Sequence, residues 1–218
     1  MVSSETGKIG IIAEAKKEDN KAPAIRYSSL REAVKAFLID PKRDKSILYA
    51  AEAKFEQAKT DPTLSKYQQS DAASSLEALH AFQSMMNQIG GMEYYMAPQG
   101  QPKLEINGVT VSINLDLLIR ADKASNPRVG GTLFRFTQAD DETEAAAMKR
   151  RDMGSYAATL VHMHVLEHFS DNATVHNSIC YAVDVQFKEA INAPKTYAQR
   201  ARNIENACKF ISAIWDSV

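Results

Sequence analysis

Asp116 is the residue whose place in the sequence most calls for a chemical role. It lies in the run VTVSINLDLLIR, which extends from Val109 to Arg120 and alternates between apolar and polar residues. A period of two predicts a β-strand with one buried face, and Asp116 falls in the second half of that strand. A carboxylate in a strand suited to burial is costly unless a partner or a metal ion compensates its charge. Asp116 is therefore the first candidate for a metal ligand or a catalytic acid.

Two histidines form a second candidate site. His164 and His168 belong to the sequence HVLEH, and a helix would place both rings on one face. The pattern resembles the H-x-x-E-H motif of the inverzincin zinc proteases, in which the two histidines bind zinc and the glutamate is the base. The alternative is that His164 packs in the core and that the helix dipole favours His168 at the helix end. We prefer this alternative, because the motif is short and the sequence supplies no identifiable third ligand.

Basic residues form a third candidate site, which could contact phosphate groups. The residues that could form this patch are Lys149, Arg150, Arg151, Arg120, Lys123 and Arg128. The alternative is a solvated helix face whose charge is offset by Glu142 and Glu144, and charge runs usually serve solvation. Tyr94 and Tyr95 could likewise stack on bases, although core packing is the favoured interpretation.

The composition is that of an ordinary globular protein. The chain has 218 residues, 44% of them hydrophobic and 24% charged, which is enough for one domain with a substantial core. A net charge of −1 gives no overall attraction for a polyanion, so nucleic-acid binding would need a local basic patch. Cys180 and Cys208 fit a reducing compartment and are expected to be buried. No apolar run approaches membrane-spanning length, and we expect a cytoplasmic protein without membrane contact.

The elements that must position these residues follow from hydrophobic periodicity. Asn107-Gly108 between two apolar runs predicts a tight β-hairpin, because both central positions of a type I′ turn need positive φ. Strands are expected over residues 103–106, 109–120, 132–138 and 178–187, with a polar loop that ends in Gly130-Gly131. Helices are expected over residues 28–39, 43–59 and 71–89, over 141–169 with an interruption at Gly154, and after Pro194 with Thr196 as the N-cap.

This order predicts an α/β fold with a small mixed β-sheet of about four strands flanked by helices. Residues 1–24 are expected to form a mobile arm, and residues 25–218 a single domain. Within that domain, residues 25–70 would be a helical N-terminal part, and residues 71–218 would have the order α-β-β-β-α-β-α.

The predicted order resembles the common core of the PD-(D/E)XK nuclease superfamily, and within it the RecB-like branch. The resemblance extends from Asp71 to Phe187. The matching stretches are SLEALHAFQSMM, INGVTVSINLDLLIRA, VGGTLFRFTQ and MGSYAATLVHMHV. This resemblance implies a site for a divalent metal ion, usually magnesium, held by an aspartate that ends the second strand and by an acid on the third strand, two residues before a lysine.

Asp116 matches the first requirement, the aspartate that ends the second strand. The third strand does not meet the second requirement, an acid two residues before a lysine. Where the acid and the lysine should stand, the chain has Leu133-Phe134-Arg135 or Arg135-Phe136-Thr137, and neither stretch supplies a carboxylate. One carboxylate binds magnesium poorly. We therefore expect a degenerate site that needs no cofactor, in which Asp116 pairs with Arg135.

Three functions remain open on these grounds. The first is a catalytically degenerate PD-(D/E)XK-like protein that associates with nucleic acid as a binding or structural component, for example in a phage or a mobile element. The second is an active magnesium-dependent DNA nuclease, in which Glu77 or Asp140 supplies the missing acid and Arg135 replaces the lysine. The third is a protein-interaction or oligomerisation module without nucleic-acid binding.

Overall fold

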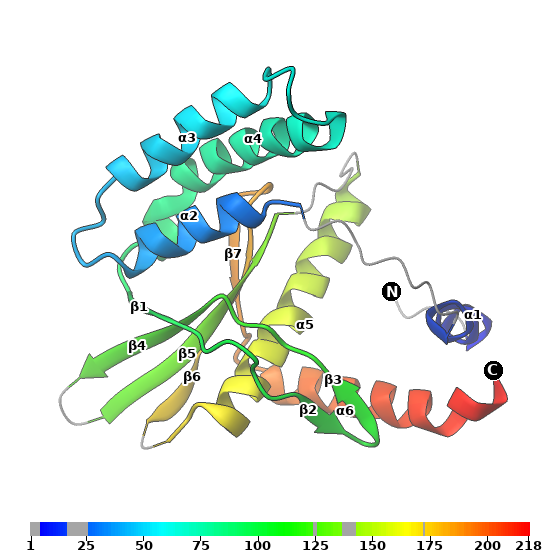
Figure 1. Cartoon of the computed structure of the whole chain (residues 1–218). Coiled ribbons are helices and arrows are strands. Elements are labelled where there is room, and N and C mark those ends of the chain that lie inside the picture. Colours follow the sequence, from blue (N-terminus) through cyan, green and yellow to red (C-terminus); the bar gives the residue numbers. More distant parts are fainter. Residues whose placement is uncertain (1–4, 17–25, 124–125, 137–142, 172) are drawn as a thin grey trace.

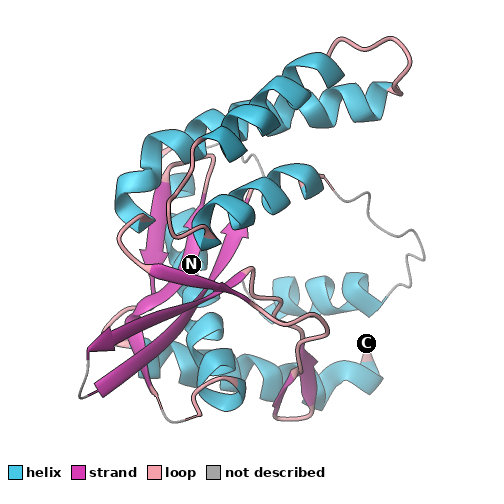
Figure 2. Cartoon of the chain, turned by 60° about the vertical axis from the view of Figure 1, so that its left-hand side comes forward, coloured by secondary structure: helices cyan, strands magenta, loops and turns pink. Residues whose placement is uncertain are grey.

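A computed structural model describes residues 5–16, 26–123, 126–136, 143–171 and 173–218 (Figure 1). It has the mixed α/β fold that the sequence predicts, with helices on both faces of a sheet (Figure 2). None of the helices in these ranges is long and apolar enough to cross a membrane. The helices are α1 (Glu5–Lys16), α2 (Ser28–Ile39), α3 (Ser46–Ala58), α4 (Lys66–Ile89), α5 (Glu144–His168), α6 (Tyr197–Ile214) and the 3-10 helix η1 (Trp215–Ser217).

The main sheet has the strand order β1-β4-β5-β6-β7. Strands β1, β4 and β5 are antiparallel neighbours, β5 and β6 are parallel, and β6 and β7 are antiparallel. Helix α5 makes the crossover between the two parallel strands, which a parallel pair requires. The five strands are β1 (Glu93–Met96), β4 (Leu117–Lys123), β5 (Asn126–Arg135), β6 (Thr174–Asp184) and β7 (Glu189–Asn192).

The predicted hairpin forms, but it is not part of the main sheet. Strands β2 (Leu104–Ile106) and β3 (Val109–Val111) make a separate two-stranded sheet around Asn107 and Gly108, whose φ angles are 48° and 79°. The prediction of one continuous strand over 109–120 is wrong, because the chain leaves the hairpin after Val111 and joins the main sheet only at Leu117. Ile113, Leu115, Leu117 and Ile119 are all buried, but they do not form the single apolar face that the sequence predicts, because the first two and the last two belong to different hydrophobic clusters.

The side chain of Gln101 explains how this break is accommodated. Its amide nitrogen donates to the Leu115 carbonyl at 2.8 Å, and its amide oxygen accepts from the Leu115 N–H at 3.0 Å. These two bonds replace those that a neighbouring strand would make, so residues 112–116 can remain irregular without leaving these groups unpaired.

The third predicted strand lies earlier than expected. β4 and β5 pair as far as Lys123 and Asn126, so the predicted polar loop is wrong, and Gly130-Gly131 lies within β5. A Cβ atom at Gly130 would lie 2.1 Å from the Ile179 carbonyl oxygen, next to a register shift between β5 and β6. Glycine is needed there because the two backbones approach each other closely. The predicted residues 137–138 lie outside the described part of the chain.

Helices α4 and α5 also differ from their predictions, and α3 is shorter than its predicted range of 43–59. α4 begins at Lys66 because Ser65 and Gln68 form a capping box, which satisfies the first free N–H groups. α5 continues through Gly154, so the predicted interruption is wrong. A Cβ atom at Gly154 would lie 2.4 Å from Cδ1 of Ile191, and the glycine lets α5 pack closely on β7. Within the predicted N-terminal arm, residues 5–16 form α1.

Hydrophobic side chains form one cluster on each face of the sheet. The first cluster joins α2, α3 and α4 to the sheet and includes Phe82 and Phe134. The second joins α5, α6 and the β2–β3 hairpin to the other face and includes Val161 and Cys180. Neither cluster includes a residue of α1. The sheet is therefore covered on both sides, which is typical of strands that lie next to a parallel pair.

Candidate functional site

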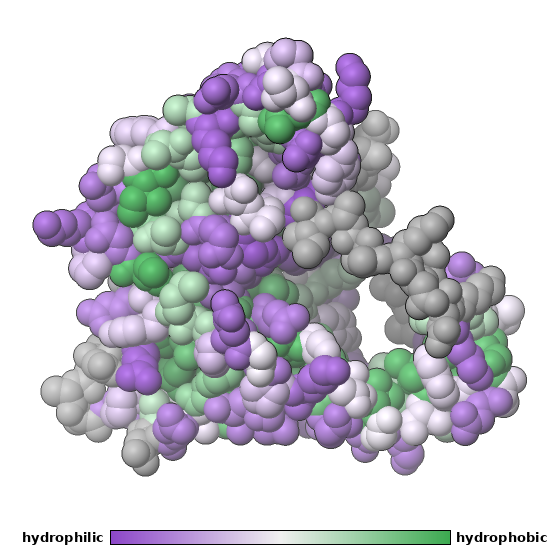
Figure 3. Space-filling view, viewed as in Figure 1, coloured by the Kyte–Doolittle hydropathy of each residue, from purple (hydrophilic) through white to green (hydrophobic). Residues whose placement is uncertain are grey.

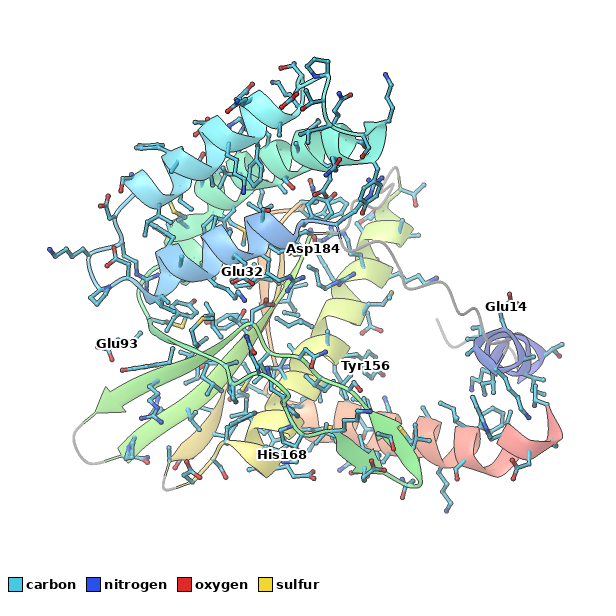
Figure 4. All side chains as sticks on the ribbon, viewed as in Figure 1. Glu14, Glu32, Glu93, Tyr156, His168 and Asp184 are labelled. Carbon is cyan, nitrogen blue, oxygen red and sulfur yellow. The ribbon has the colours of Figure 1, made fainter. Side chains whose placement is uncertain are left out.

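The candidate residues that the structure gathers lie at one end of the sheet. β5 and β6 are parallel and end at Arg135 and Asp184, and the antiparallel neighbour β4 is preceded by Asp116 at the same end. Figure 4 labels Asp184, which lies beside the N-terminal half of α5. The end of a parallel pair is where α/β proteins commonly place their functional side chains.

Asp116 forms the first part of this site, and its partner is an arginine on α2. Nη1 of Arg31 lies 2.6 Å from both carboxylate oxygens of Asp116. The Phe134 N–H donates to Oδ2 of Asp116 at 2.7 Å, and Nη2 of Arg31 donates to the Phe134 carbonyl at 3.1 Å. The guanidinium also lies 5.1 Å from the centre of the Phe136 ring. Both carboxylate oxygens are therefore engaged inside the protein.

The expected pairing of Asp116 with Arg135 is wrong. Arg31 takes that place, although it is 85 residues away in the sequence, because α2 packs on the face of the sheet from which Asp116 is reached. Arg135 points instead to Asp184, with 3.8 Å between its Nη1 and Oδ2 of the carboxylate. Sequence reasoning missed Arg31, because an arginine on the polar side of a helix carries no signal of a distant partner.

Asp184 forms the second part of the site. It is 2% exposed, and Nη1 of Arg150 lies 3.8 Å from its Oδ2, as does Nη1 of Arg135. Its Oδ1 has no hydrogen-bond partner among the described residues. Burial raises the pKa of Asp184, and the nearby Arg135 and Arg150 oppose that rise. The sequence signal was the same as for Asp116, a carboxylate in a strand suited to burial.

Two residues of the predicted basic patch belong to this second part and face carboxylates of the protein. Arg150 is buried, donates to Glu189 at 3.1 Å and lies 3.6 Å from the centre of the Phe187 ring. Arg151 donates twice to the same carboxylate, at 2.7 and 2.9 Å. These hydrogen bonds, those from Arg151 first, hold the pKa of Glu189 below its usual value. Lys149 is exposed on the same helix.

Arg120, the fourth predicted phosphate contact, lies on β4, next to the opposite edge strand β1. It pairs in register with Glu93 of β1, and its guanidinium lies 5.4 Å from the centre of the exposed Tyr95 ring. Arg150 and Arg151 contact β7 at the other edge. The structure therefore does not bring the predicted basic residues together into one patch.

The two histidines pack in the interior of the protein. The His164 ring is fully buried, its Nε2 lies 3.2 Å from Oε1 of Gln101, and its centre lies 5.0 Å from that of the His168 ring. Burial, with some repulsion from His168, lowers the pKa of His164 to about 4. His164 is therefore neutral at physiological pH, and through Gln101 it supports the segment that leads to Asp116.

The structure supplies little that could hold a metal ion. Over the ranges described, no group of three or more histidine, cysteine, aspartate or glutamate side chains has the arrangement of a metal site. Glu77 is exposed on α4, whereas Asp116 is buried. Asp140 lies outside the described residues. What the gathered residues can do chemically is bind one another through charge-assisted hydrogen bonds.

Comparison of the chain with protein-family models, with curated proteins and with solved structures gives no match.

Proposed function

We propose that this chain is a non-catalytic protein with a PD-(D/E)XK-like core, which associates with nucleic acid as a binding or structural component. The observation that carries the proposal is the Arg31–Asp116 pair. In the nuclease family that the sequence resembles, the matching aspartate holds the metal ion. Here an arginine and a backbone N–H occupy its oxygens.

The order and direction of the strands support the part of the proposal that concerns the fold. Three antiparallel strands, β1, β4 and β5, are followed by the crossover helix α5 and by the parallel strand β6. Helix α4 precedes them, which is similar to the order that the resemblance implies, but β1 takes the place of the strand expected over 103–106, and the β2–β3 hairpin lies between β1 and β4 in the chain. Because one fold can serve many functions, the functional part of the proposal depends on the site.

The energetics of the pair support loss of metal binding. The Asp116 side chain is 4% exposed, and a metal ion would have to displace Arg31 to reach it. Removing one member of a buried ion pair costs about 3 to 5 kcal/mol, because the other charge remains buried without a partner to compensate it. The partly exposed Arg31 places the cost here at the lower end of that range.

The surface that we propose for nucleic-acid contact is formed by Arg120, Tyr95 and Arg128. Arg120 and Arg128 line a hollow of about 280 Å³ together with Phe169. Tyr95 is exposed beside Arg120. Arginines beside an exposed aromatic ring suit single-stranded nucleic acid, since phosphates pair with the arginines and bases stack on the ring. Asp171 also lines the hollow, and Glu93 accepts a hydrogen bond from the Tyr95 hydroxyl, so the positive charge of this surface is local to the two arginines.

The test has a cleavage arm and a binding arm. Single- and double-stranded DNA and RNA are incubated with the protein in magnesium or manganese, and we expect no cleavage above background. Binding of the same probes is then measured at about 50 mM salt and below, where phosphate contacts are strongest. We expect binding that weakens as salt rises and that weakens further in Arg120→Ala and Arg128→Ala, while Lys54→Ala, which removes an exposed charge on α3, leaves it unchanged.

Each alternative function has a distinct outcome. Metal-dependent cleavage that disappears in Asp116→Ala would overturn the proposal in favour of an active nuclease. Absence of binding to every probe at low salt would overturn it in favour of a protein-interaction module.

A further inference from the structure

A hollow of about 480 Å³ lies where the C-terminal end of α2 meets β1, the edge strand of the main sheet. One wall comes from the end of α2 and the turn after it, and the other comes from β1 and the turn before it. Hydrophobic and hydrophilic side chains lie next to each other over α2 and β1 (Figure 3). Sites for small molecules commonly have volumes of roughly 300 to 1,000 Å³, so the hollow has a suitable size.

Arg43 brings a positive charge to this hollow, and its guanidinium is held by three neighbours. The centre of the guanidinium lies 5.2 Å from the centre of the Tyr94 ring and 5.9 Å from that of the Phe37 ring. Nη2 of Arg43 donates to the Met92 carbonyl at 2.5 Å. The backbone of Arg43 has a φ angle of 50°, which is uncommon for a residue other than glycine. The contacts therefore hold the guanidinium in place before a ligand arrives.

One nitrogen of this guanidinium remains available for a ligand. Nη1 of Arg43 is buried and has no hydrogen-bond acceptor among the described residues. Burial lowers the pKa of Arg43, because the charge is held away from water. A small rotation of the guanidinium in its own plane would bring Nη1 to the hollow and keep both ring contacts. A charged donor without an acceptor is costly, so a group that supplies an acceptor binds favourably there.

Two carboxylates also line the hollow, and both already accept hydrogen bonds. Asp40 accepts from the backbone N–H groups of Lys42 and Asp44, at 3.2 and 2.7 Å. Glu93 accepts from the Tyr95 hydroxyl at 3.1 Å. Because both carboxylates repel a negative ligand, the single cation favours an anion with one charge over a doubly charged group such as phosphate.

The remaining lining provides apolar surface and free space. Ile39 and Met92 are half-buried and line the hollow beside Arg43. Gly91 also lines it, and no atom of the described residues lies within 4 Å of the position that a Cβ atom would take there. An apolar group attached to the anion would therefore find both contact surface and room.

We infer that the hollow between α2 and β1 binds a small carboxylic acid, whose carboxylate accepts from Nη1 of Arg43 and whose apolar part lies against Ile39 and Met92. A carboxylate has one charge and two acceptor oxygens in a plane, which suits the geometry of a guanidinium. The inference does not rest on nucleic-acid binding, because the hollow that Arg120 and Arg128 line shares no lining residue with this one.

The first experiment is calorimetric titration of the full chain with two acids, hexanoate and 3-phenylpropionate. Each probe has a matched neutral control, hexanamide or 3-phenylpropanamide. Probe concentrations up to about 10 mM reveal a dissociation constant of about 1 mM. We expect at least one acid to bind, and its amide to bind at least about tenfold more weakly, since the charge-assisted hydrogen bond is lost. No binding of either acid, or equal affinity of acid and amide, would overturn the inference.

The second experiment locates the bound acid with two variants of the hollow. Arg43→Met removes the charge and keeps an apolar side chain, and we expect the affinity for the acid to fall at least about tenfold. Because Arg43 also contacts Tyr94 and Phe37, Gly91→Leu is measured in parallel. Its leucine enters open space in the hollow and leaves Arg43 unchanged, so it should block binding without loss of the fold.

The matched control is Lys54→Met, which removes an exposed cation of α3 outside the hollow and should leave the affinity unchanged. In nuclear magnetic resonance spectra of the parent chain, we expect the acid to shift the amide signals of Gly90 and Gly91. Unchanged affinity in both Arg43→Met and Gly91→Leu, or signal shifts confined to residues away from the hollow, would show that the acid binds elsewhere and that the inference is wrong.

Discussion

At the scale of single residues, the candidate site is defined by which arginine pairs with which buried carboxylate. Asp116 was expected to meet Arg135, and it meets Arg31. Arg135 meets Asp184, a carboxylate that was not singled out from the sequence. Each carboxylate thus has an arginine from another element. Arg150 of α5 also lies 3.8 Å from Asp184, so Asp116 and Asp184 link α2 and α5 to the same end of the sheet.

The Arg31–Asp116 pair leads to a prediction about stability. Arg31→Ala leaves the Asp116 carboxylate with the Phe134 N–H as its remaining hydrogen-bond donor among the described residues. We expect the free energy of unfolding to fall by about 3 kcal/mol in urea denaturation, since one charge of a buried pair then lacks its partner. Glu32→Ala on the same helix removes the exposed member of an i,i+3 pair with Lys35 and should cost less than about 1 kcal/mol. Equal stability of the two variants would contradict the account of Asp116 given above.

The buried His164 leads to a prediction about pH. Its pKa is lowered to about 4 in the folded protein, from 6.5, so the unfolded chain binds more protons between these values. The contribution of His164 to stability is therefore complete above pH 6.5 and is lost as the pH falls towards 4. Burial also lowers the pKa of His162, which acts in the same direction.

The measurement is urea denaturation at a series of pH values. We expect His164→Leu to flatten the loss of stability between about pH 6.5 and pH 4, because leucine takes up no proton. His80→Leu, which changes an exposed histidine beside Glu52, should keep the slope of the parent protein. A slope that His164→Leu leaves unchanged would show that other groups cause the acid sensitivity.

At the scale of elements, glycines decide how closely strands and helices approach. A Cβ atom at Gly130 would meet the backbone oxygen of Ile179, whereas a Cβ atom at Gly154 would meet the end of the Ile191 side chain. A backbone oxygen in a paired strand cannot move away, but a side chain can change its rotamer. Replacing a glycine hydrogen with a methyl group therefore has different consequences at the two positions.

We expect Gly130→Ala to lower the free energy of unfolding by about 2 to 3 kcal/mol, the upper part of the range for overpacking in a core. Gly154→Ala should cost less, because Ile191 can adjust and alanine favours the helix. Gly91→Ala serves as the control, since nothing lies within 4 Å of its Cβ position. Thermal or urea unfolding of the three variants measures the order, and a cost at Gly154 above that at Gly130 would contradict it.

At the scale of the whole molecule, one sheet joins two hydrophobic clusters. Each strand of the parallel pair has one face in each cluster, so neither layer of helices can lose its packing without exposing the sheet. This arrangement predicts that residues 25–218 unfold together as one unit.

Leu79→Ala and Val161→Ala test this cooperativity, because the two fully buried residues lie in different clusters. We expect each to lower the stability by about 1 to 4 kcal/mol and to shift a single unfolding transition seen by far-ultraviolet circular dichroism. Two transitions, with each variant shifting one of them, would show that the two layers are separate units.

Much of the local structure could be predicted from the sequence. Asn107-Gly108 gave the hairpin turn, because the requirement for positive φ depends on these two residues alone. The helix over 28–39 has the predicted bounds, and β6 (Thr174–Asp184) covers most of the strand expected over 178–187. These features depend on neighbours within a few positions in the chain.

Apart from the start of α4, which a local capping box sets, the main errors lie where distant segments meet. The strand over 109–120 is interrupted because Gln101 satisfies the backbone of Leu115, and Gly130-Gly131 lies in a strand because Ile179 of β6 needs the space. The sequence near each position gave no sign of these partners, since both effects come from a residue on another element.

The candidate site shows the same division. The sequence by itself determined that Asp116 is a buried carboxylate and that the third strand supplies no second acid, because both facts depend on residue type and period. Only the tertiary structure decided that Arg31 would neutralise Asp116 and that Asp184 would lie between Arg135 and Arg150. The physical reason is that the pairing of charges depends on which helix packs on which face of the sheet, and long-range packing sets that arrangement.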